Sequence, residues 1–259
     1  MPRIKWISVV LFGTLCLVFS PATTFGQSPQ ENSTPGSAKD FLSSCFARFK
    51  QKDWDGAIAD CSKAIELDPQ LRDSYLLRGT MLRDAKGNLD GAIADFDKAI
   101  KVDPTLVEAY RLRAWTRYLQ KDLDGAINDF TIMIEKDPSA GSYQERGLVR
   151  LAKNDLDKAI DDLNVSIEKS PGFIGSYELR AKAKLMKKDF EGSIADFGVV
   201  IQNNPKSTNA HLGRGLALLS LGRDIEAQRD FDKVIELDPN KKAEVEVSIA
   251  RVKRQRGGN

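Results

Sequence analysis

The chain has 259 residues, of which 41% are hydrophobic and 29% charged, a composition typical of a soluble protein with a buried core. Its formal net charge of +2 arises from Arg3 and Lys5, so residues 27–259 carry equal numbers of basic and acidic side chains. A balanced body offers no general attraction for nucleic acid or an anionic membrane surface. We therefore expect no nucleic-acid partner and no membrane insertion of the mature chain.

Residues 1–26 have the order of a secretory signal peptide. A short basic segment precedes an uncharged apolar run from Trp6 to Phe19, and small and turn-forming residues follow up to Gly26. The run has 14 residues, fewer than the roughly 20 that a membrane-spanning helix needs. We expect export to the periplasm or the extracellular space, with cleavage after Gly26 or Ala22. An uncleaved anchor that tethers the chain to a membrane is the alternative.

Residues 27–37 are polar, contain proline and glycine, and have too few apolar residues to fold, so they are expected to form a flexible leader. Six repeats follow, each ending near a proline that stands 33 to 35 residues after the one before. The prolines are Pro69, Pro104, Pro138, Pro171, Pro205 and Pro239. The repeats span about 38–71, 72–106, 107–140, 141–173, 174–207 and 208–239.

The spacing of residues within each repeat predicts two antiparallel helices. An aromatic residue or His211 is followed four positions later by a small residue, and a second small residue is followed four positions later by an apolar one. Offsets of four place both pairs on one helix face each, so the two small residues let the backbones approach closely. The predicted N-caps of the second helices are Asp53, Asn88, Asp122, Asp155, Asp189 and Asp224.

A closing helix is expected over residues 240–255, followed by a basic tail up to residue 259. Ala243, Val247 and Ala250 share one face of this helix, beside Val245, Ile249 and Val252, and the apolar side is predicted to cover the end of the array.

The units resemble tetratricopeptide repeats over roughly residues 38–239. Six units hold the aromatic, small, aromatic and proline positions of that family in phase. The resemblance implies an all-α fold, a right-handed superhelical solenoid of antiparallel helix pairs with a C-terminal capping helix. It also implies a scaffold that binds a protein or peptide, without a cofactor and without catalysis.

Catalytic and metal chemistry have little support in the sequence. His211 is the single histidine, and it occupies the ring position of the last repeat, where packing is the expected role. No Cys/His cluster has the spacing of a metal site. We therefore expect no catalytic, cofactor-binding or metal-binding residues.

Cys45 and Cys61 lie on the facing seams of the first hairpin. Export would place them in an oxidising compartment, where they could form a disulfide. Two small core residues are the alternative, because the sequence does not fix the distance between their Cα atoms.

An arginine follows the ring by three residues in the last five repeats, and an aspartate follows the small residue of every second helix by three. The first repeat has Ser44 at the arginine position but keeps Asp60. Pairing within repeats would leave Asp60 without an arginine. We therefore predict ion pairs between repeats, with each arginine bound to the aspartate of the preceding hairpin, for example Asp60 with Arg78.

The resemblance also places the first helix of each repeat along a concave groove. The candidate peptide-binding residues at the exposed offsets are Arg111, Trp115, Tyr118, Leu119, Gln144, Leu148 and Leu151. Packing between neighbouring hairpins is the alternative role for Trp115, Tyr118 and Leu119. The leading function is an exported scaffold for an unidentified protein or peptide. The runner-up is a structural element that self-associates or joins a larger envelope assembly; the sequence leaves the oligomeric state open.

Overall fold

The structure is a computed structural model that describes residues 36–257. The predicted signal peptide and most of the predicted leader lie outside these described residues. Within residues 36–257 the chain forms thirteen α-helices and one short 3-10 helix, and no strand occurs there.

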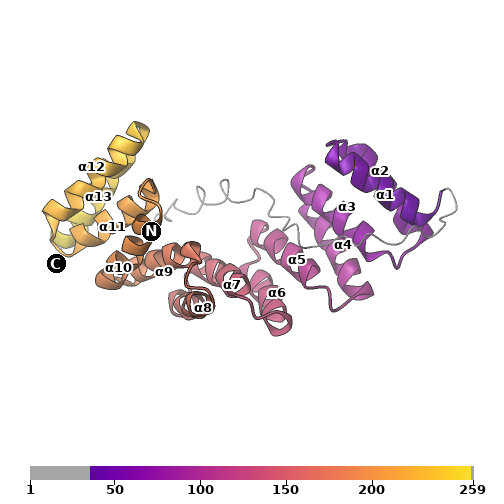
Figure 1. The fold of residues 1–259 in the computed structure, drawn as a ribbon, viewed down its shortest axis with the longest axis horizontal. Helices are drawn as coiled ribbons and strands as arrows, with labels where there is room; N and C mark the ends of the chain where they lie inside the picture. The colour runs from indigo at the N-terminus through magenta and orange to yellow at the C-terminus, as the bar shows by residue number, and fades with distance from the viewer. Residues whose placement is uncertain (1–35, 258–259) are drawn as a thin grey trace. The chain divides into compact units, whose positions relative to one another are not determined.

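The helices follow one another as antiparallel pairs with short connections (Figure 1). Hairpins 1 to 3 consist of α1 (Ala38–Lys50) with α2 (Trp54–Leu67), α3 (Arg72–Asp84) with α4 (Leu89–Val102), and α5 (Val107–Leu119) with α6 (Leu123–Lys136). Hairpins 4 to 6 consist of α7 (Ala140–Lys153) with α8 (Leu156–Lys169), α9 (Ile174–Lys187) with α10 (Phe190–Asn203), and α11 (Thr208–Ser220) with α12 (Asp224–Leu237). The 3-10 turn Pro239–Lys241 leads into the closing helix α13 (Lys242–Gly257).

The chain divides after Pro104 into two compact units. In the first, α2 of hairpin 1 packs against α3 of hairpin 2. In the second, hairpins 3 to 6 pack in chain order through α6 and α7, α8 and α9, and α10 and α11, and α13 packs on α11. Each unit is thus a stack of helix hairpins, and the fold class is the all-α solenoid of antiparallel helix pairs.

The predicted seams form the core of every hairpin. The apolar residues of the second helices are almost fully buried: Cys61, Phe96, Phe130, Leu163, Phe197 and Phe231. The small residues on the facing first helices leave the space that these side chains fill. A Cβ built on Gly79 would lie 2.8 Å from Cε1 of Phe96, and one on Gly215 would lie 2.7 Å from Cε1 of Phe231. The aromatic rings therefore rest almost on the backbone of the facing helix.

Four of the predicted N-caps are made as expected. The side chains of Asp53, Asn88, Asp122 and Asp189 each accept a hydrogen bond from the backbone N–H of the glycine three residues later. Asp155 stands at the N-cap of α8 without such a bond. The prediction for Asp224 is wrong: α12 begins at the same place in the repeat as the other second helices, so Arg223 is its N-cap and Asp224 its first helical residue.

The closing helix forms where it was predicted, but it buries a different face. Val245 and Ser248 are buried, whereas Ala243, Val247 and Ala250 are exposed. Val245 is 1% exposed, whereas Val247 on the predicted face is 59% exposed. Among residues 36–257, no helix is long and apolar enough to span a membrane.

Candidate functional site

The first helices of hairpins 3, 4 and 5 lie next to one another and present the candidate binding residues. Arg111 on α5 binds Glu145 on α7, with 2.8 Å between Nε and Oε1. The side-chain amide of Gln144 on α7 lies over Gly175 of α9, where a Cβ would be 2.6 Å from Nε2. We call the surface made by these helices the first-helix face. Its members are Arg111, Trp115 and Leu119 on α5, Gln144, Leu148 and Leu151 on α7, and Glu178, Lys182 and Met186 on α9.

The face is apolar on one side and polar on the other. Leu119 and Met186 are each 42% exposed, and Leu148 and Leu151 are half-buried between them along the chain. Arg111, Gln144 and Glu178 occupy the equivalent polar position on the three helices, and Lys182 pairs with Glu178 at 2.5 Å. This arrangement suits a ligand that has both apolar and polar side chains.

Trp115 and Tyr118 both make packing contacts within hairpin 3. The Trp115 ring meets the buried Phe130 edge-to-face at 5.4 Å between centroids, and it meets Tyr118 in the same way at 5.6 Å. Tyr118 is only 4% exposed, so it is part of the core rather than of the surface. Trp115 keeps a partly exposed edge, and its Nε1–H donates to Oε1 of Glu145 over 3.2 Å.

Glu145 is a carboxylate held at the base of this face. One of its oxygens accepts from both Arg111 and Trp115, and its side chain is 15% exposed. Burial raises the pKa of Glu145, and the hydrogen bonds from Arg111 and Trp115 oppose that rise. The sequence offered no signal for this residue, because it stands one position away from the offsets that define the groove.

The prediction that the arginines pair with the preceding hairpin is wrong. Each arginine binds the aspartate of its own hairpin, with N–O distances of 2.6–2.7 Å: Arg78 with Asp95, Arg113 with Asp129, Arg146 with Asp162, Arg180 with Asp196 and Arg214 with Asp230. In an antiparallel hairpin, residues 16 or 17 positions apart face each other across the two helices. We call these the closing pairs.

Hairpin 1 has no arginine at the position that pairs with the aspartate in the other hairpins. Other side chains of hairpin 1 bind Asp60 instead. Asp60 accepts from Ser44 at 2.7 Å and pairs with Arg48 at 2.9 Å. Arg48 stands four residues after the arginine position, and the cations at the equivalent position of hairpins 3, 4 and 5 also pair with the aspartate of their own hairpin. Arg117 pairs with Asp129, Arg150 with Asp162 and Lys184 with Asp196, at 2.8–2.9 Å.

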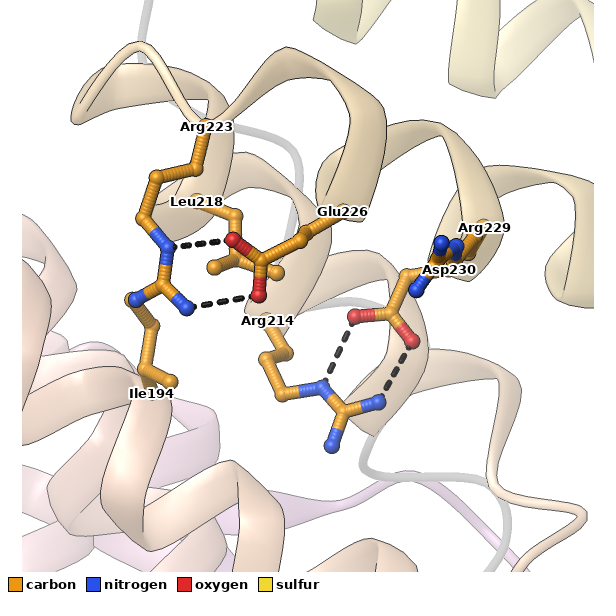
Figure 2. Close-up of a pocket in the computed structure, with 7 residues that line it drawn as sticks. All are labelled: Ile194, Arg214, Leu218, Arg223, Glu226, Arg229 and Asp230. Carbon is orange, nitrogen blue, oxygen red and sulfur yellow. Dashed lines mark hydrogen bonds and ion pairs between the residues drawn. The ribbon is translucent and has the colours of Figure 1, made fainter.

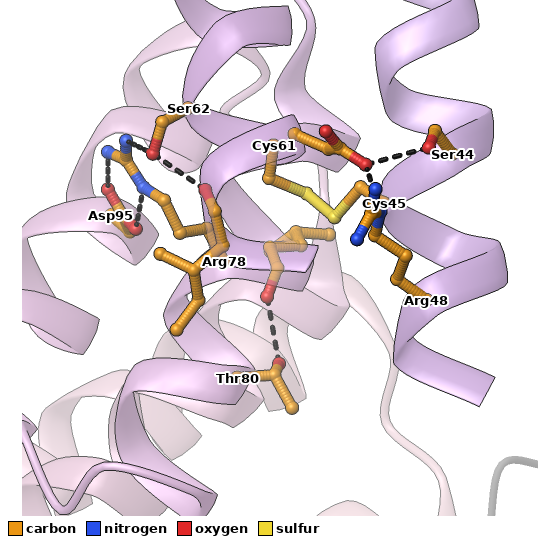
Figure 3. Close-up of a disulfide and its surroundings, with 11 residues drawn as sticks. Ser44, Cys45, Arg48, Cys61, Ser62, Arg78, Thr80 and Asp95 are labelled. Atoms are coloured by element: carbon orange, nitrogen blue, oxygen red, sulfur yellow. Dashed lines mark hydrogen bonds and ion pairs between the residues drawn. A yellow bond between two sulfur atoms is a disulfide. The ribbon is translucent and has the colours of Figure 1, made fainter. Parts of the chain in front are cut away.

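The closing arginines also reach the preceding hairpin, but through a third nitrogen and to a neutral group. Nη1 of Arg78 donates to Oγ of Ser62, as Figure 3 shows, and Nη1 of Arg146 donates to Oγ1 of Thr131. Nη1 of Arg180 donates to Oδ1 of Asn164. Each acceptor lies two residues after the aspartate of the preceding hairpin. The guanidinium thus joins the two helices of its own hairpin and also fixes the register of that hairpin against the preceding one.

Charged bridges between hairpins do occur, with other residues. A cation at or just after the end of a first helix, or at the end of α13, meets an acidic residue in the first turn of the preceding second helix: Lys86 with Asp55, Lys153 with Asp124, Lys187 with Asp157 and Arg256 with Asp224. The acidic partners are at least half exposed. Such bridges add little to stability.

Cys45 and Cys61 are joined by a disulfide in hairpin 1 (Figure 3). Their Cα atoms are 5.4 Å apart, because the small position of the first helix, Cys45, faces the apolar position of the second helix, Cys61. In every other hairpin the equivalent residues are a glycine or alanine facing an apolar side chain. The disulfide therefore replaces an aromatic contact with a covalent one.

His211 is a buried structural residue. Its Nδ1 lies 2.8 Å from Oδ1 of Asp230, and its Nε2 lies 3.1 Å from the carbonyl oxygen of Pro205. Both ring nitrogens are thus occupied by neighbours of its own hairpin and turn. Across the described residues, no group of three His, Cys, Asp or Glu side chains is arranged to hold a metal ion.

The comparisons with known proteins agree with this architecture. Family models described as tetratricopeptide repeat match residues 81–141 and 208–241. None of the curated proteins matches the sequence. Among solved structures, a tetratricopeptide repeat protein from Parabacteroides merdae is similar with a TM-score of 0.66 and 17% identity, over 85% of this chain and 92% of that one.

Two further structures share the fold. YrrB, described as a TPR protein with an unusual peptide-binding site, has a TM-score of 0.61 and 17% identity, over 75% of this chain and 97% of its own. Yeast Tom70 has a TM-score of 0.57 and 22% identity, over 85% of this chain and 47% of its own. The two matched segments are thus tetratricopeptide repeats, and the described hairpins share the fold of tetratricopeptide repeat proteins.

Proposed function

We propose that this protein is a non-enzymatic scaffold that binds a protein or peptide through the first-helix face of hairpins 3 to 5. The observation that carries the proposal is the apolar row from Leu119 to Met186 beside a polar row from Arg111 to Glu178. A row of partly exposed apolar side chains over the first helices of hairpins 3 to 5, with Leu119 and Met186 each 42% exposed, suits a surface that a partner covers. The peptide-binding site named for YrrB supports the same use of a similar fold.

The face fits a segment with alternating apolar and polar contacts. Leu119, Leu148 and Met186 would take apolar side chains, and Arg111 and Gln144 would fix the polar ones. Trp115 supplies the large, partly exposed ring that most often dominates binding energy. Tyr118 acts indirectly, by supporting Trp115 from the core.

Two exposed substitutions test this function without disturbing the fold. Leu119→Asp and Met186→Asp should abolish capture of a partner from the native cell envelope, because a carboxylate would have to be buried under the ligand. Their melting temperatures should stay close to that of the unmodified protein. Leu67→Asp is the matched control, since Leu67 is 49% exposed on a second helix. Equal capture by all three variants would refute the site.

Export is part of the proposal and rests on the order of residues 1–26. The expected mature N-terminus is Gln27, or Thr23 for the alternative cleavage site. Intact-mass measurement of protein from the producing cell tests this. Retention of Met1 to Phe25 would favour the membrane-tethered form instead.

The exposed face of α13 supports a second candidate function. Ala243, Val247 and Ala250 form a small apolar strip on the terminal helix, where a second copy or a larger assembly could pack. Size-exclusion chromatography with light scattering distinguishes the two functions. The scaffold predicts a monomer, and the assembly element predicts stable self-association that Val247→Asp removes.

A further inference from the structure

The junction between hairpins 5 and 6 contains a pocket of about 320 Å3 (Figure 2). It is lined by Ile194 of α10, Arg214 and Leu218 of α11, and Arg223, Glu226, Arg229 and Asp230 at the start of and along α12. Three arginines and two carboxylates give this lining an excess of one positive charge. The pocket is separate from the first-helix face described above.

The pocket arises where hairpin 6 departs from the repeat. Leu218 stands at the position where Arg117, Arg150 and Lys184 pair with the aspartates of hairpins 3, 4 and 5. The shorter, neutral side chain leaves the space beside Asp230 open. Hairpin 2 also has a leucine there, Leu82, but its closing arginine is fully engaged with neighbours.

A second departure leaves a donor of Arg214 without an acceptor. In hairpins 2, 4 and 5 the Nη1 group of the closing arginine donates to Ser62, Thr131 or Asn164 of the preceding hairpin. The equivalent residue for Arg214 is Gly198, which has no side chain. Arg214 donates through Nε and Nη2 to Asp230, and within residues 36–257 its Nη1 has no partner. Figure 2 shows this nitrogen turned away from Asp230.

A third departure adds cations to the pocket. The N-cap aspartate or asparagine and the third-position glycine of α2, α4, α6 and α10 are replaced in α12 by Arg223 and Glu226, which pair with each other at 2.6–2.7 Å. Arg229 lines the pocket, and among the described residues it makes no ion pair or hydrogen bond. Both carboxylates of the lining are already bound by arginines. Within residues 36–257, Nη1 of Arg214 and the guanidinium of Arg229 remain donors without an acceptor, so a ligand that brings acceptors fits them.

We propose that this pocket binds the carboxylate of an acidic side chain on a partner peptide, through Nη1 of Arg214 and the guanidinium of Arg229. Guanidinium groups match a carboxylate in charge and in planar geometry. Leu218 and Ile194 supply an apolar wall that fits the methylene groups of a glutamate. The site adds an acidic residue to the description of the partner, and it stands or falls independently of the first-helix face.

Titration with a blocked amino acid tests the proposal directly. N-acetyl-glutamate N-methylamide is expected to produce saturable NMR shifts in the side-chain Nε–H signals of Arg214 and Arg229. The isosteric N-acetyl-glutamine N-methylamide should bind at least about tenfold more weakly, because it lacks the charge. Equal binding of the two probes, no saturable shift, or tighter binding of inorganic phosphate than of the glutamate probe would each overturn the carboxylate assignment.

Two variants restore the repeat pattern and should close the site. Gly198→Thr supplies the missing acceptor for Arg214, and nothing lies within 4 Å of a Cβ at that position. Leu218→Arg supplies the missing cation and fills the space. Both are expected to lose the saturable shift, and Arg229→Gln should weaken binding about tenfold. Arg251→Gln, on α13, is the control and should bind normally. Gly198→Thr keeps the test valid if Leu218→Arg does not fold; unchanged binding by Gly198→Thr would refute the role of Arg214.

Discussion

The turns inside the hairpins place lysine in a conformation that suits glycine. Lys52, Lys121 and Lys188 have φ angles of 62°, 70° and 66°, in the left-handed region. Gly87 and Gly222 occupy the same place in hairpins 2 and 6. A side chain with a Cβ is strained there by about 1–2 kcal/mol, and the structure around the turn must offset that strain.

Lys121→Gly should therefore raise the free energy of unfolding by up to about 1 kcal/mol, after allowance for the greater freedom of glycine in the unfolded chain. Chemical denaturation measures the change. Gly222→Ala is the reverse substitution and should lower stability by a similar amount. A loss of stability in Lys121→Gly would show that the lysine side chain makes a contact that outweighs the strain.

Glu145 should make stability depend on pH. Because burial raises its pKa in the folded state, the folded protein holds this proton more tightly than the unfolded chain does. The stabilisation from that proton is present below the unfolded pKa and is lost as pH rises through the folded pKa. Glu145→Gln removes the titration, so the stability of this variant relative to the unmodified protein should increase as pH rises from the unfolded pKa of about 4.3 through the raised folded pKa. A difference that is constant over this range would contradict the burial argument.

The closing pairs and the outer bridges use the same residue types with different consequences. Asp162 is 4% exposed and holds two arginines that are themselves mostly buried, Arg146 and Arg150. Asp124 is 78% exposed and holds Lys153. Removal of a buried partner leaves uncompensated charge, whereas an exposed pair is screened by solvent.

Asp162→Ala should therefore destabilise the protein by about 3–5 kcal/mol, and Asp124→Ala by less than about 1 kcal/mol. Urea denaturation of the two single variants provides the comparison. Similar losses in both would mean that the arginines of hairpin 4 relax into solvent when their aspartate is removed.

The disulfide should protect hairpin 1 in particular. It closes a loop of 16 residues, for which the restriction of the unfolded chain is worth about 3 kcal/mol. The double variant Cys45→Ala, Cys61→Ala should expose the amides of α1 and α2 to faster hydrogen exchange, while α7 and α8 exchange at unchanged rates. Uniform loss of protection over all helices would show that hairpin 1 supports the rest of the array.

The repeat frame allowed the helices, the seams and most of the caps to be predicted from sequence, because each depends on local spacing. The partners of long charged side chains were not predictable in the same way. A closing arginine can contact both its own hairpin and the preceding one. The absence of an arginine at Ser44 therefore suggested that Asp60 pairs with the following hairpin, whereas Ser44 and Arg48 bind it within its own. The face of α13 was missed because its apolar residues follow two registers, and only contact with α11 selects that of Val245.

The binding surface was only partly predictable for a related reason. The offsets from the ring identify the first-helix face, but they do not show that Tyr118 turns into the core while Trp115 keeps an exposed edge. The sequence shows that the arginine of repeat 6 lacks the side-chain acceptor that the arginines of repeats 2, 4 and 5 have in the preceding repeat. Gly198 and Leu218 are visible in the sequence as departures, but their importance depends on knowing which nitrogen of the arginine they leave exposed.

The closing pairs have a kinetic consequence. Each joins residues only 16 or 17 positions apart, and the disulfide spans the same distance. Contacts of such short range form quickly, since little chain entropy must be lost before they are made. A hairpin that has just left the ribosome already contains both members of its closing pair and can fold before the next one is synthesised. The order of synthesis can thus become the order of folding, with each finished hairpin serving as the template for the one behind it.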